Sequence, residues 1–458
     1  MAYIKFIDRE EELKSLGDIG RRSFFLVVSG RRRIGKTRLL RKAFPKAAYI
    51  FIWPDKSMGW IIDQVCKENG LPSYREFKDL LGHFLGQGKA IIIDEFQNLL
   101  SVDKSTYGEI QRLIDDRKIN GGFLQLAAAG SSYSLMNKVF NDAASPLYGR
   151  RTDEIVLGNI PIKPLFNSLG RPLEDFIKLW SVFEGVPYYY ELLDSSADAE
   201  NNIERLIISG SAQLQGEGKA LLSSEFGRDS KTYSTVLTGI SEGKTKLGEL
   251  AGLFGGKKNE VVKYLDILRN DFRLVKKMTP VADDPRKSRE GRYEISDNFL
   301  SFWFYFVERL RSYSEQGRPE ELKAFFSKEF NSFLGRKFEK FMAELIKEGI
   351  LLKGLNPTSV GGQWGATAGA GGQYEVDIVA LNSLKNEAVI CECKWKENVN
   401  CKKAAAELER KSGYIRWKSA TKVSYALFAK SFDKKIVEFG GKKIVCMDFK
   451  DIRAALKG

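Results

Sequence analysis

Short apolar runs alternate with amphipathic stretches in the first third of the chain. Runs at 24–29 (FFLVVS), 47–53, 90–93 (AIII) and 123–129 (FLQLAAA) have the length and the uninterrupted apolar character of strands buried on both faces. Helix-like stretches, such as TRLLRKAF after the first run, separate them. Strands that alternate with helices predict a parallel sheet covered by helices.

The middle of the chain has helical periodicity. It runs from 160 to about 227, and three more helix-like segments joined by glycine turns follow at 232–243, 246–254 and 259–274. A hairpin-like stretch rich in Lys and Arg comes next, at 283–292, and leads into 293–296. That order predicts a winged helix-turn-helix. Four polar residues would lie at or near the start of its recognition helix, where side chains could meet a DNA groove: Lys257, Lys258, Asn259 and Lys263.

The last part of the chain predicts a helix followed by a hairpin. Apolar residues of 335–349 fall on one helical face, and two strand-like runs at 374–381 and 388–396 flank a polar turn. We interpret the glycine-rich stretch 360–372 as a loop. The aromatic stretch 297–310 is apolar on nearly all sides, which predicts a buried helix.

Composition describes a globular protein of several domains. With 458 residues the chain is too long for one compact core, and its hydrophobic fraction is 43%. No apolar run approaches the about 20 residues that cross a bilayer, and the first residues do not resemble a secretory signal. We expect a cytoplasmic protein that does not enter a membrane, with its five cysteines reduced.

The charge favours a polyanionic partner. The net charge is +14, and residues 390–458 alone hold 17 Lys and Arg against 8 Asp and Glu. Lysine and arginine gain affinity for nucleic acid by displacing counterions. We therefore expect a nucleic acid partner, with DNA favoured; a general solubility charge is the alternative.

A phosphate-binding pattern follows the first apolar run. Residues 30–37 read GRRRIGKT, a full match to G-x-x-x-x-G-K-[ST], between a strand-like run and a helix-like stretch. In such a loop backbone N–H groups surround phosphate oxygens, Lys36 reaches the β- and γ-phosphates, and the Thr37 hydroxyl ligates Mg²⁺. The cofactors predicted are ATP or ADP with Mg²⁺. The predicted binding residues are Gly30, Arg31, Arg32, Arg33, Ile34, Gly35, Lys36, Thr37 and Arg38.

Two acids end the third apolar run. Asp94 and Glu95 directly follow AIII, as in a Walker B strand, where the first acid holds Mg²⁺ and the second polarises the attacking water. Helix capping would explain such a pair on its own. Downstream of a full phosphate loop we favour the Walker B interpretation, with Asp94 as a metal residue and Glu95 as a catalytic one.

These motifs resemble a known family, the archaeal P-loop ATPases of the STAND and AAA+ group. The resemblance rests on F-x-x-R-E-x-E-L from Phe6, on GRRRIGKTRLL, IIIDEFQNL and AGSS, and on SPLYGRRT at 145–152, and it extends through nearly the whole chain. It implies that Arg9 lies near the nucleotide base, that Ser131 is a sensor and that Arg150 takes part in γ-phosphate sensing. For Arg150 a solvated turn is the alternative. The resemblance also implies a helical lid and slow switching.

Carboxylates and a lysine gather in the predicted C-terminal hairpin. Asp377 lies on its first strand, and Glu392 and Lys394 share one face of the second because strand side chains alternate. Phosphodiester hydrolysis needs a hard cation held by carboxylates. We predict that Asp377 and Glu392 bind Mg²⁺ and that Lys394 orients or activates water. A salt-bridged strand face is the alternative. Farther along, Lys411 and Arg416 are predicted to face either phosphate or solvent.

The pattern D-x₁₄-E-x-K resembles the PD-(D/E)xK nuclease superfamily, with Val376 where a proline often stands. The resemblance implies that Glu339, on the preceding helix, is a further catalytic residue. The fold class expected is therefore a multidomain α/β protein. Its parts are a P-loop parallel-sheet ATPase core (1–160), a helical lid (161–230), a winged helix-turn-helix (231–300), a helical linker (301–330) and an α/β restriction-endonuclease-like domain (331–458).

Two functional hypotheses follow. In the first, an ATP-binding switch ATPase regulates a DNA-binding, Mg²⁺-dependent nuclease-like domain in defence or mobile-element biology. In the second, a regulatory or scaffold ATPase carries an inactive nuclease-like domain and acts on protein partners through its winged helix, since fold does not determine function. An oligomer is compatible with both. A processive motor is disfavoured because no helicase motifs accompany the loop.

Overall fold

The computed structural model describes residues 7–226, 230–367, 372–417 and 421–458, so Phe6 of the opening motif and part of the glycine-rich stretch lie outside the described residues. Contacts divide the chain into two compact units. Of the described residues, 7–160 and Val186–Tyr190 form the amino-terminal unit, and Pro161–Gly185 with Glu191–Gly458 forms the carboxy-terminal unit. The division into five domains stays a prediction; its lid, 161–230, contains Val186–Tyr190, which belongs to the amino-terminal unit.

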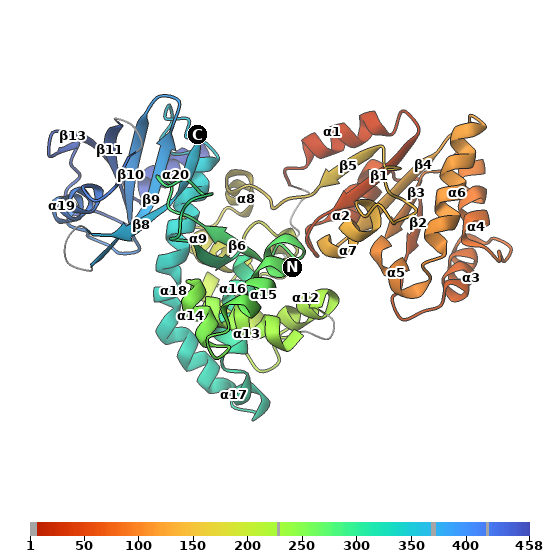
Figure 1. The fold of residues 1–458 in the computed structure, drawn as a ribbon, viewed down its shortest axis with the longest axis horizontal. Coiled ribbons are helices and arrows are strands. Elements are labelled where there is room, and N and C mark those ends of the chain that lie inside the picture. Colours follow the sequence, from red (N-terminus) through yellow and green to blue (C-terminus); the bar gives the residue numbers. More distant parts are fainter. Residues whose placement is uncertain (1–6, 227–229, 368–371, 418–420) are drawn as a thin grey trace. The chain divides into compact units, whose positions relative to one another are not determined.

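The amino-terminal unit is built on a five-stranded parallel sheet (Figure 1). The strand order is β2-β3-β4-β1-β5, and every described pairing in it is parallel. All residues of β1 and β3, the inner strands that lead into the predicted phosphate loop and the two acids, are buried, which confirms the predicted parallel-sheet core. The strands are β1 (Phe24–Ser29), β2 (Ala48–Phe51), β3 (Ile91–Asp94), β4 (Gln125–Gly130) and β5 (Asp153–Val156).

Helices pack around this sheet and close its core (Figure 1). Phe25 of β1, Ile93 of β3 and Phe96 of the following turn share one hydrophobic cluster with side chains of the surrounding helices. The helices are α1 (Glu10–Ile19), α2 (Lys36–Ala43), α3 (Met58–Asn69), α4 (Phe77–Gly86), α5 (Leu99–Val102), α6 (Thr106–Ile119) and α7 (Tyr133–Phe140). Because all strands are parallel, their carboxyl ends meet at one edge of the sheet, where the chain enters its loops.

The carboxy-terminal unit begins with helices, as the periodicity predicted. They are α8 (Ile162–Leu169), α9 (Leu173–Phe183), α10 (Pro187–Glu191, mostly in the amino-terminal unit), α11 (Ala199–Ile203), a π-helical turn (Glu204–Ile208) and α12 (Glu217–Phe226).

Three helices and a two-stranded hairpin come next, in the order that the sequence predicted. The helices are α13 (Ser230–Ser241), α14 (Leu247–Gly252) and α15 (Lys258–Asn270), and the antiparallel strands are β6 (Val275–Met278) and β7 (Arg292–Ile295). The stretch rich in Lys and Arg connects the two strands.

A long helix, α18 (Pro319–Lys347), joins the helical region to the last sheet. It follows α16 (Asn298–Trp303), a π-helical turn (Phe304–Glu308) and α17 (Arg311–Glu315). Phe302 and Phe306 pack against aromatic rings of α18, so the aromatic stretch is buried as predicted. The 29 residues of this helix run across the predicted boundary at residue 330.

The C-terminal sheet is mixed, with the order β12-β13-β11-β10-β9-β8. Strands β8, β9 and β10 pair antiparallel, whereas β10, β11 and β13 pair parallel. Helix α19 (Cys401–Ser412) is the crossover between β10 and β11. The remaining elements are β8 (Ser359–Ala366), β9 (Gln373–Asn382), β10 (Glu387–Lys394), β11 (Lys422–Ala429), β12 (Glu438–Phe439), β13 (Lys442–Met447) and α20 (Phe449–Lys457).

The glycine-rich stretch is a strand over most of its length, so the loop interpretation was wrong there. Strand β8 pairs with β9 from Ser359↔Leu381 to Ala366↔Gln373, with a shift in register between Gly361 and Gln363. The Trp364 indole N–H donates to the carbonyl of Glu290, 2.8 Å away. Strand β8 is held to β9 by backbone hydrogen bonds, which do not depend on side chains. Its glycine-rich composition therefore did not predict a strand.

No helix in the described ranges combines the length and the apolar character needed to cross a membrane.

Candidate functional site

The phosphate loop connects β1 to α2 and depends on two glycines. Gly30 has a φ of 154°, and a Cβ there would lie 2.6 Å from the carbonyl oxygen of Leu157. Gly35, directly before α2, has a φ of 99°. Residues that carry a Cβ rarely adopt these backbone angles, so both positions require glycine. The loop then opens at the N-terminus of α2, where backbone N–H groups attract anions.

Lys36 is buried at the base of this loop. The residue is only 6% exposed. Its Nζ donates hydrogen bonds to the carbonyl oxygens of Gly30 (2.9 Å) and Arg31 (3.1 Å). Burial lowers the pKa of Lys36, whereas the nearby charges of Glu95 and Asp94 raise it. An ammonium group held at the loop in this way is placed to meet a phosphate group there.

Asp94 is the last residue of β3, and both of its carboxylate oxygens accept hydrogen bonds. Oδ2 accepts hydrogen bonds from the hydroxyls of Thr37 (2.5 Å) and Tyr49 (2.9 Å), and Oδ1 accepts one from the Glu95 N–H (3.0 Å). Sequence reasoning missed Tyr49, which reaches Asp94 from the neighbouring strand β2. Burial, followed by the charge of Asp94, raises the pKa of the Tyr49 phenol, so this phenol stays a donor at neutral pH.

Glu95 follows Asp94 in the left-handed region, with a φ of 51°. Its Oε2 accepts hydrogen bonds from Gln97 Nε2 (2.6 Å) and from the Ser131 hydroxyl (2.7 Å). Ser131 follows β4, so the structure brings the predicted sensor serine to the predicted catalytic glutamate. Gln97 is a further partner that the sequence analysis did not identify.

Other predicted nucleotide residues do not converge on the loop. Arg150 Nη2 pairs with Asp115 Oδ2 on α6 at 3.0 Å, and its Nη1 donates to the carbonyl of Pro146. Arg9 is buried and donates to Glu12 Oε1 and the carbonyl of Gly158. Their roles in phosphate sensing and near the base stay predictions. Ile34 is buried, whereas Arg32 and Arg38 are exposed.

A distant segment packs against the phosphate loop and was also missed. The guanidinium of Arg33 lies 4.1 Å from the ring centre of Tyr188, and that of Arg31 lies 5.7 Å from Tyr189. Arg31 Nη2 also donates to the Tyr189 hydroxyl at 3.4 Å. This is why Val186–Tyr190 belongs to the amino-terminal unit although the chain on both sides belongs to the other. No local pattern marks such a contact across more than 150 residues.

The donor set fits a nucleotide with Mg²⁺. Glycines 30 and 35 make a cradle that a Cβ would fill or strain, and the hydroxyl of Thr37 lies beside the carboxylate of Asp94. Oxygen ligands of this kind, few in number, are those that Mg²⁺ prefers when phosphates complete its shell. The amino-terminal unit thus has the fold and the loop of a P-loop ATPase.

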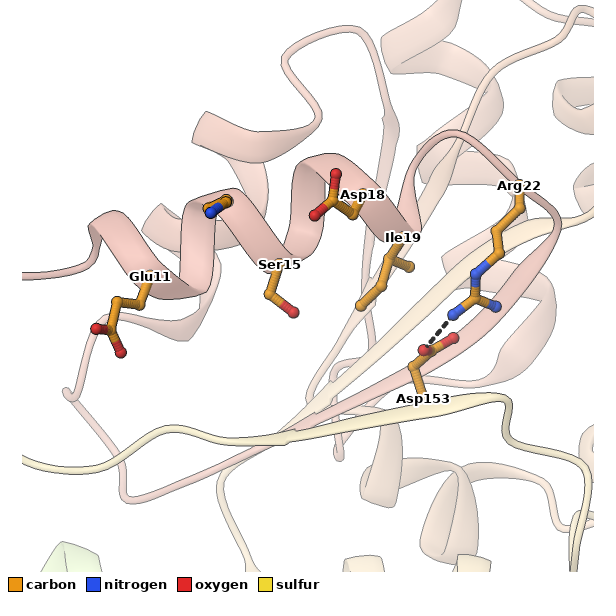
Figure 2. Close-up of a pocket in the computed structure, with 7 residues that line it drawn as sticks. Glu11, Ser15, Asp18, Ile19, Arg22 and Asp153 are labelled. Carbon is orange, nitrogen blue, oxygen red and sulfur yellow. Dashed lines mark hydrogen bonds and ion pairs between the residues drawn. The ribbon is translucent and has the colours of Figure 1, made fainter.

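A hollow of about 570 Å³ lies at the other edge of this sheet (Figure 2). Arg22, just before β1, pairs there with Asp153 at the start of β5, at 2.5 Å. Since parallel strands start at the edge opposite to the one where they end, this hollow is separate from the phosphate loop. Its lining has mixed charge: Glu11, Lys14, Ser15, Asp18, Ile19, Arg22 and Asp153.

The second candidate site centres on Glu392 of β10, which is 1% exposed. Lys394 Nζ lies 2.5 Å from Glu392 Oε1, as the shared strand face predicted. Lys411 Nζ, from α19, donates to both oxygens, at 3.1 Å to Oε1 and 3.0 Å to Oε2. One buried carboxylate is therefore held between two ammonium groups, and Lys411 faces this carboxylate.

Asp377 lies next to this pair on β9. The ladder between β9 and β10 ends at the pair Cys391↔Ile378, and Asp377 Oδ2 then accepts the N–H of Cys393 at 2.7 Å. Burial first, and the charge of Glu392 second, raise the pKa of Asp377 to about 7.

Glu339 faces the same group of charges from α18. Burial raises the pKa of Glu339 to about 9, and the charges of Asp377, Glu375 and Glu392 add to the effect. The structure therefore brings together all four residues predicted here, Glu339, Asp377, Glu392 and Lys394. Glu375, whose charge also acts on Glu339, is largely exposed and pairs with Arg292 at 2.8 Å.

The described part of the chain contains no group of three or more His, Cys, Asp or Glu side chains placed to hold a metal ion. Asp377 and Glu392 are the carboxylates that would hold Mg²⁺ here, although lysines already contact both oxygens of Glu392. This ion is often held by one or two carboxylates together with substrate phosphates. A cation would also offset the repulsion from Glu392, which adds to the effect of burial in raising the pKa of Asp377.

The predicted DNA-contacting residues are accessible. Lys257, Lys258, Asn259 and Lys263 are exposed at and near the start of α15, and Arg416 is exposed beyond α19.

Comparison with known proteins identifies the family. The chain is 30% identical over 445 residues to the uncharacterized protein MJECL04 of Methanocaldococcus jannaschii. The match covers 94% of this chain and 97% of the archaeal protein. The chain belongs to the family of this archaeal protein. A family model, DUF234, described as archaeal and bacterial proteins of unknown function, matches residues 303–406. That range includes Glu339, Asp377, Glu392 and Lys394 but ends before Lys411.

Solved structures are similar at a lower level. The Walker-type ATPase PABY2304 of Pyrococcus abyssi is 17% identical and covers 65% of this chain and 96% of its own, with a TM-score of 0.49. The ORC2 protein of Aeropyrum pernix is 15% identical, covers 69% and 96%, and has a TM-score of 0.39. A STAND protein with a tetratricopeptide repeat sensor from Pyrococcus horikoshii is 14% identical, covers 75% and 50%, and has a TM-score of 0.29.

Proposed function

We propose that this protein is an ATP-binding switch ATPase that regulates a DNA-binding, Mg²⁺-dependent nuclease-like domain. The observation that carries the ATPase part is the convergence of Walker residues at one edge of the parallel sheet. Thr37 contacts Asp94, and Ser131 contacts Glu95, although the four residues come from three separate segments of the chain.

Each residue has a defined task in nucleotide binding and hydrolysis. Backbone N–H groups of the loop bind phosphate oxygens, and Lys36 neutralises their charge. Thr37 and Asp94 would hold Mg²⁺, which supplies charge stabilisation for phosphoryl transfer. Glu95 orients the attacking water. Because Ser131 and Gln97 both occupy Glu95 Oε2, this glutamate is restrained, which supports slow hydrolysis of the switch type.

Two variants test the ATPase proposal. Lys36→Ala should abolish binding of a fluorescent ATP analogue and any phosphate release, because the phosphates lose their main cation. Glu95→Gln should bind nucleotide like the wild type but release phosphate roughly a hundredfold more slowly. Lys42→Ala, which alters an exposed lysine of the same helix, should behave like the wild type. Full nucleotide affinity in Lys36→Ala would refute the site.

The nuclease-like part rests on the carboxylate site and its setting. A helix, an antiparallel β8-β9-β10 meander and a crossover helix to the parallel strand β11 frame Asp377, Glu392 and Lys394. This order supports a PD-(D/E)xK-like fold. Asp377 and Glu392 would hold Mg²⁺, which supplies Lewis acidity at the phosphate. Lys394 orients water, and Lys411 neutralises charge near Glu392.

Access to DNA is the remaining part of this proposal. The order of α13, α14, α15, β6 and β7 supports a winged helix, and lysines are exposed at the start of α15. The net charge of +14 supports a polyanion as the partner. DNA binding should therefore weaken steeply as salt rises.

A plasmid nicking assay with Mg²⁺ tests cleavage. Asp377→Ala and Lys394→Ala should each lose nicking activity, because one removes a metal ligand and the other a group that orients water. Lys402→Ala changes an exposed lysine of α19 and should nick like the wild type. Equal activity in wild type, Asp377→Ala and Lys394→Ala would refute the site.

The second candidate function is a regulatory or scaffold ATPase with an inactive nuclease-like domain. One observation favours it: both oxygens of Glu392 are already occupied by lysines. This function predicts ATP binding without metal-dependent cleavage, and binding of protein partners that responds little to salt.

A further inference from the structure

Two cysteines far apart in sequence lie side by side in the C-terminal sheet domain. Cys401 is the first residue of α19 and Cys446 lies on β13, and their sulfur atoms are 2.9 Å apart. Both are free thiols in this structure. Since a disulfide bond is about 2.05 Å long, the sulfurs need to approach by only about 0.9 Å to form one.

The backbone on both sides is held in place. The Cys401 N–H donates to Asp433 Oδ1 at 3.1 Å, and Asn400, which caps α19, donates to Asp433 Oδ2 at 2.8 Å. Cys446 pairs with Leu427 in the ladder between β13 and β11. The close approach of the sulfurs is therefore set by secondary structure, and bond formation needs little rearrangement.

The two thiols differ in access. Cys401 is fully buried in the hydrophobic cluster under α19, whereas Cys446 is partly exposed. Burial raises the pKa of Cys401 to about 12, which makes it a poor first target for an oxidant. Cys446 is thus the thiol that an oxidant reaches first, and Cys401 is in position to resolve the product.

We propose that Cys401 and Cys446 are a redox modification site that closes to an intrachain disulfide. Hydrogen peroxide transfers one oxygen to Cys446, which gives a sulfenic acid and water. The Cys401 sulfur then attacks the Cys446 sulfur, the S–S bond forms, the S–O bond breaks, and a second water leaves. Two thiols lose two electrons and two protons, and one peroxide is reduced to two waters.

The cross-link joins the first turn of the crossover helix to β13. It closes a loop from residue 401 to residue 446, which lowers the entropy of the unfolded chain. The same helix supplies Lys411 to Glu392. Oxidation therefore fixes one end of the helix that holds this lysine, independently of whether the domain cleaves nucleic acid.

Peptide mapping of the full chain tests the site. The reduced protein is treated with hydrogen peroxide, alkylated in denaturant, digested without reductant and analysed by mass spectrometry. The expected result is one cross-linked pair of peptides, containing residues 401 and 446 and lighter by two hydrogen atoms than the two thiol peptides. Cys66, Cys391 and Cys393 should stay alkylated, and dithiothreitol should reverse the link.

Thermal melting provides a second measurement. Oxidation should raise the melting temperature of the unit that contains the pair by about 5 to 10 °C. Cys446→Ser should lose both the link and the shift, whereas the double variant Cys391→Ser, Cys393→Ser should keep the link. If Cys446→Ser does not fold, peptide mapping of the wild type still shows whether the disulfide between residues 401 and 446 forms.

Three outcomes would overturn the proposal. They are alkylation of both cysteines after peroxide treatment, conversion of Cys446 to sulfinic acid without a cross-link, and a disulfide that joins separate chains.

Discussion

The Tyr49 hydroxyl shares one oxygen of Asp94 with the Thr37 hydroxyl, and so helps to orient a carboxylate proposed to hold Mg²⁺. A hydrogen bond to a charged group is worth about 1.5–3 kcal/mol. We expect Tyr49→Phe to weaken nucleotide binding in Mg²⁺ roughly tenfold or more and to leave binding in EDTA nearly unchanged. Titration of a fluorescent ATP analogue with and without Mg²⁺ measures both affinities.

The control for this prediction is Tyr148→Phe, at a half-exposed tyrosine of the same unit, which should behave like the wild type. Equal affinity of Tyr49→Phe and wild type in Mg²⁺ would show that the hydrogen bond to Asp94 has no role in metal binding.

Glu339 makes stability depend on pH. Its pKa is about 9 in the folded protein and 4.5 ordinarily, so the folded state keeps a proton that the unfolded chain releases. This contribution is fully present below pH of about 4.5 and is lost as the pH rises toward about 9. Glu339→Gln stays neutral at every pH. In EDTA we expect the variant to melt several degrees above the wild type at pH 8 and close to it at pH 5.

Melting curves between pH 5 and pH 9, followed by circular dichroism, measure this difference. Glu320→Gln, exposed in the first turn of the same helix, is the control and should follow the wild type. Parallel curves for wild type and Glu339→Gln would contradict the raised pKa.

At the scale of elements, α18 connects the helical region to the C-terminal sheet. On one face Phe341 packs against Trp180 and Phe176 of α9, with ring centres 5.0 and 6.0 Å apart, and the same helix presents Glu339 to the carboxylate site. The periodicity of 335–349 predicted which residues this helix buries, because an amphipathic pattern depends only on local spacing. Its N-terminal half, and its packing on α9, depend on residues far away in sequence.

Phe341→Ala tests this packing. Removing a fully buried ring should destabilise the carboxy-terminal unit by about 3–5 kcal/mol, because the lost contacts leave a cavity. Urea unfolding, followed by tryptophan fluorescence, measures the change. Lys328→Ala on the exposed side of α18 should cost little. A loss below about 1 kcal/mol for Phe341→Ala would contradict the packing of α18 on α9.

At the scale of the whole molecule, two compact units are joined by a chain that passes between them more than once. Nucleotide binds only the folded amino-terminal unit in our proposal, so it should stabilise that unit alone. We expect calorimetry to show two transitions, and a non-hydrolysable ATP analogue at about a hundred times its Kd to add about 2.7 kcal/mol to one of them.

Lys36→Ala should show both transitions without the shift. A single transition that moves as a whole with nucleotide would mean that the two units unfold together.

The sequence by itself determined the elements and the chemistry that are local. The phosphate loop, the two acids at the end of β3, and the hairpin with Asp377, Glu392 and Lys394 were all predicted because short spacing and strand alternation decide them. Strand β8 was not predicted, because its glycine-rich sequence gives no sign of the backbone hydrogen bonds that pair it with β9.

Only the tertiary structure decided which distant groups meet. Tyr49 reaches Asp94 from a neighbouring strand, Lys411 reaches Glu392 from a crossover helix, Tyr188 and Tyr189 reach the phosphate loop, and Cys401 meets Cys446. Strand order and helix packing set these contacts, and both depend on burial of apolar surface over the whole chain. No local pattern in the sequence predicts which apolar surfaces become buried against one another.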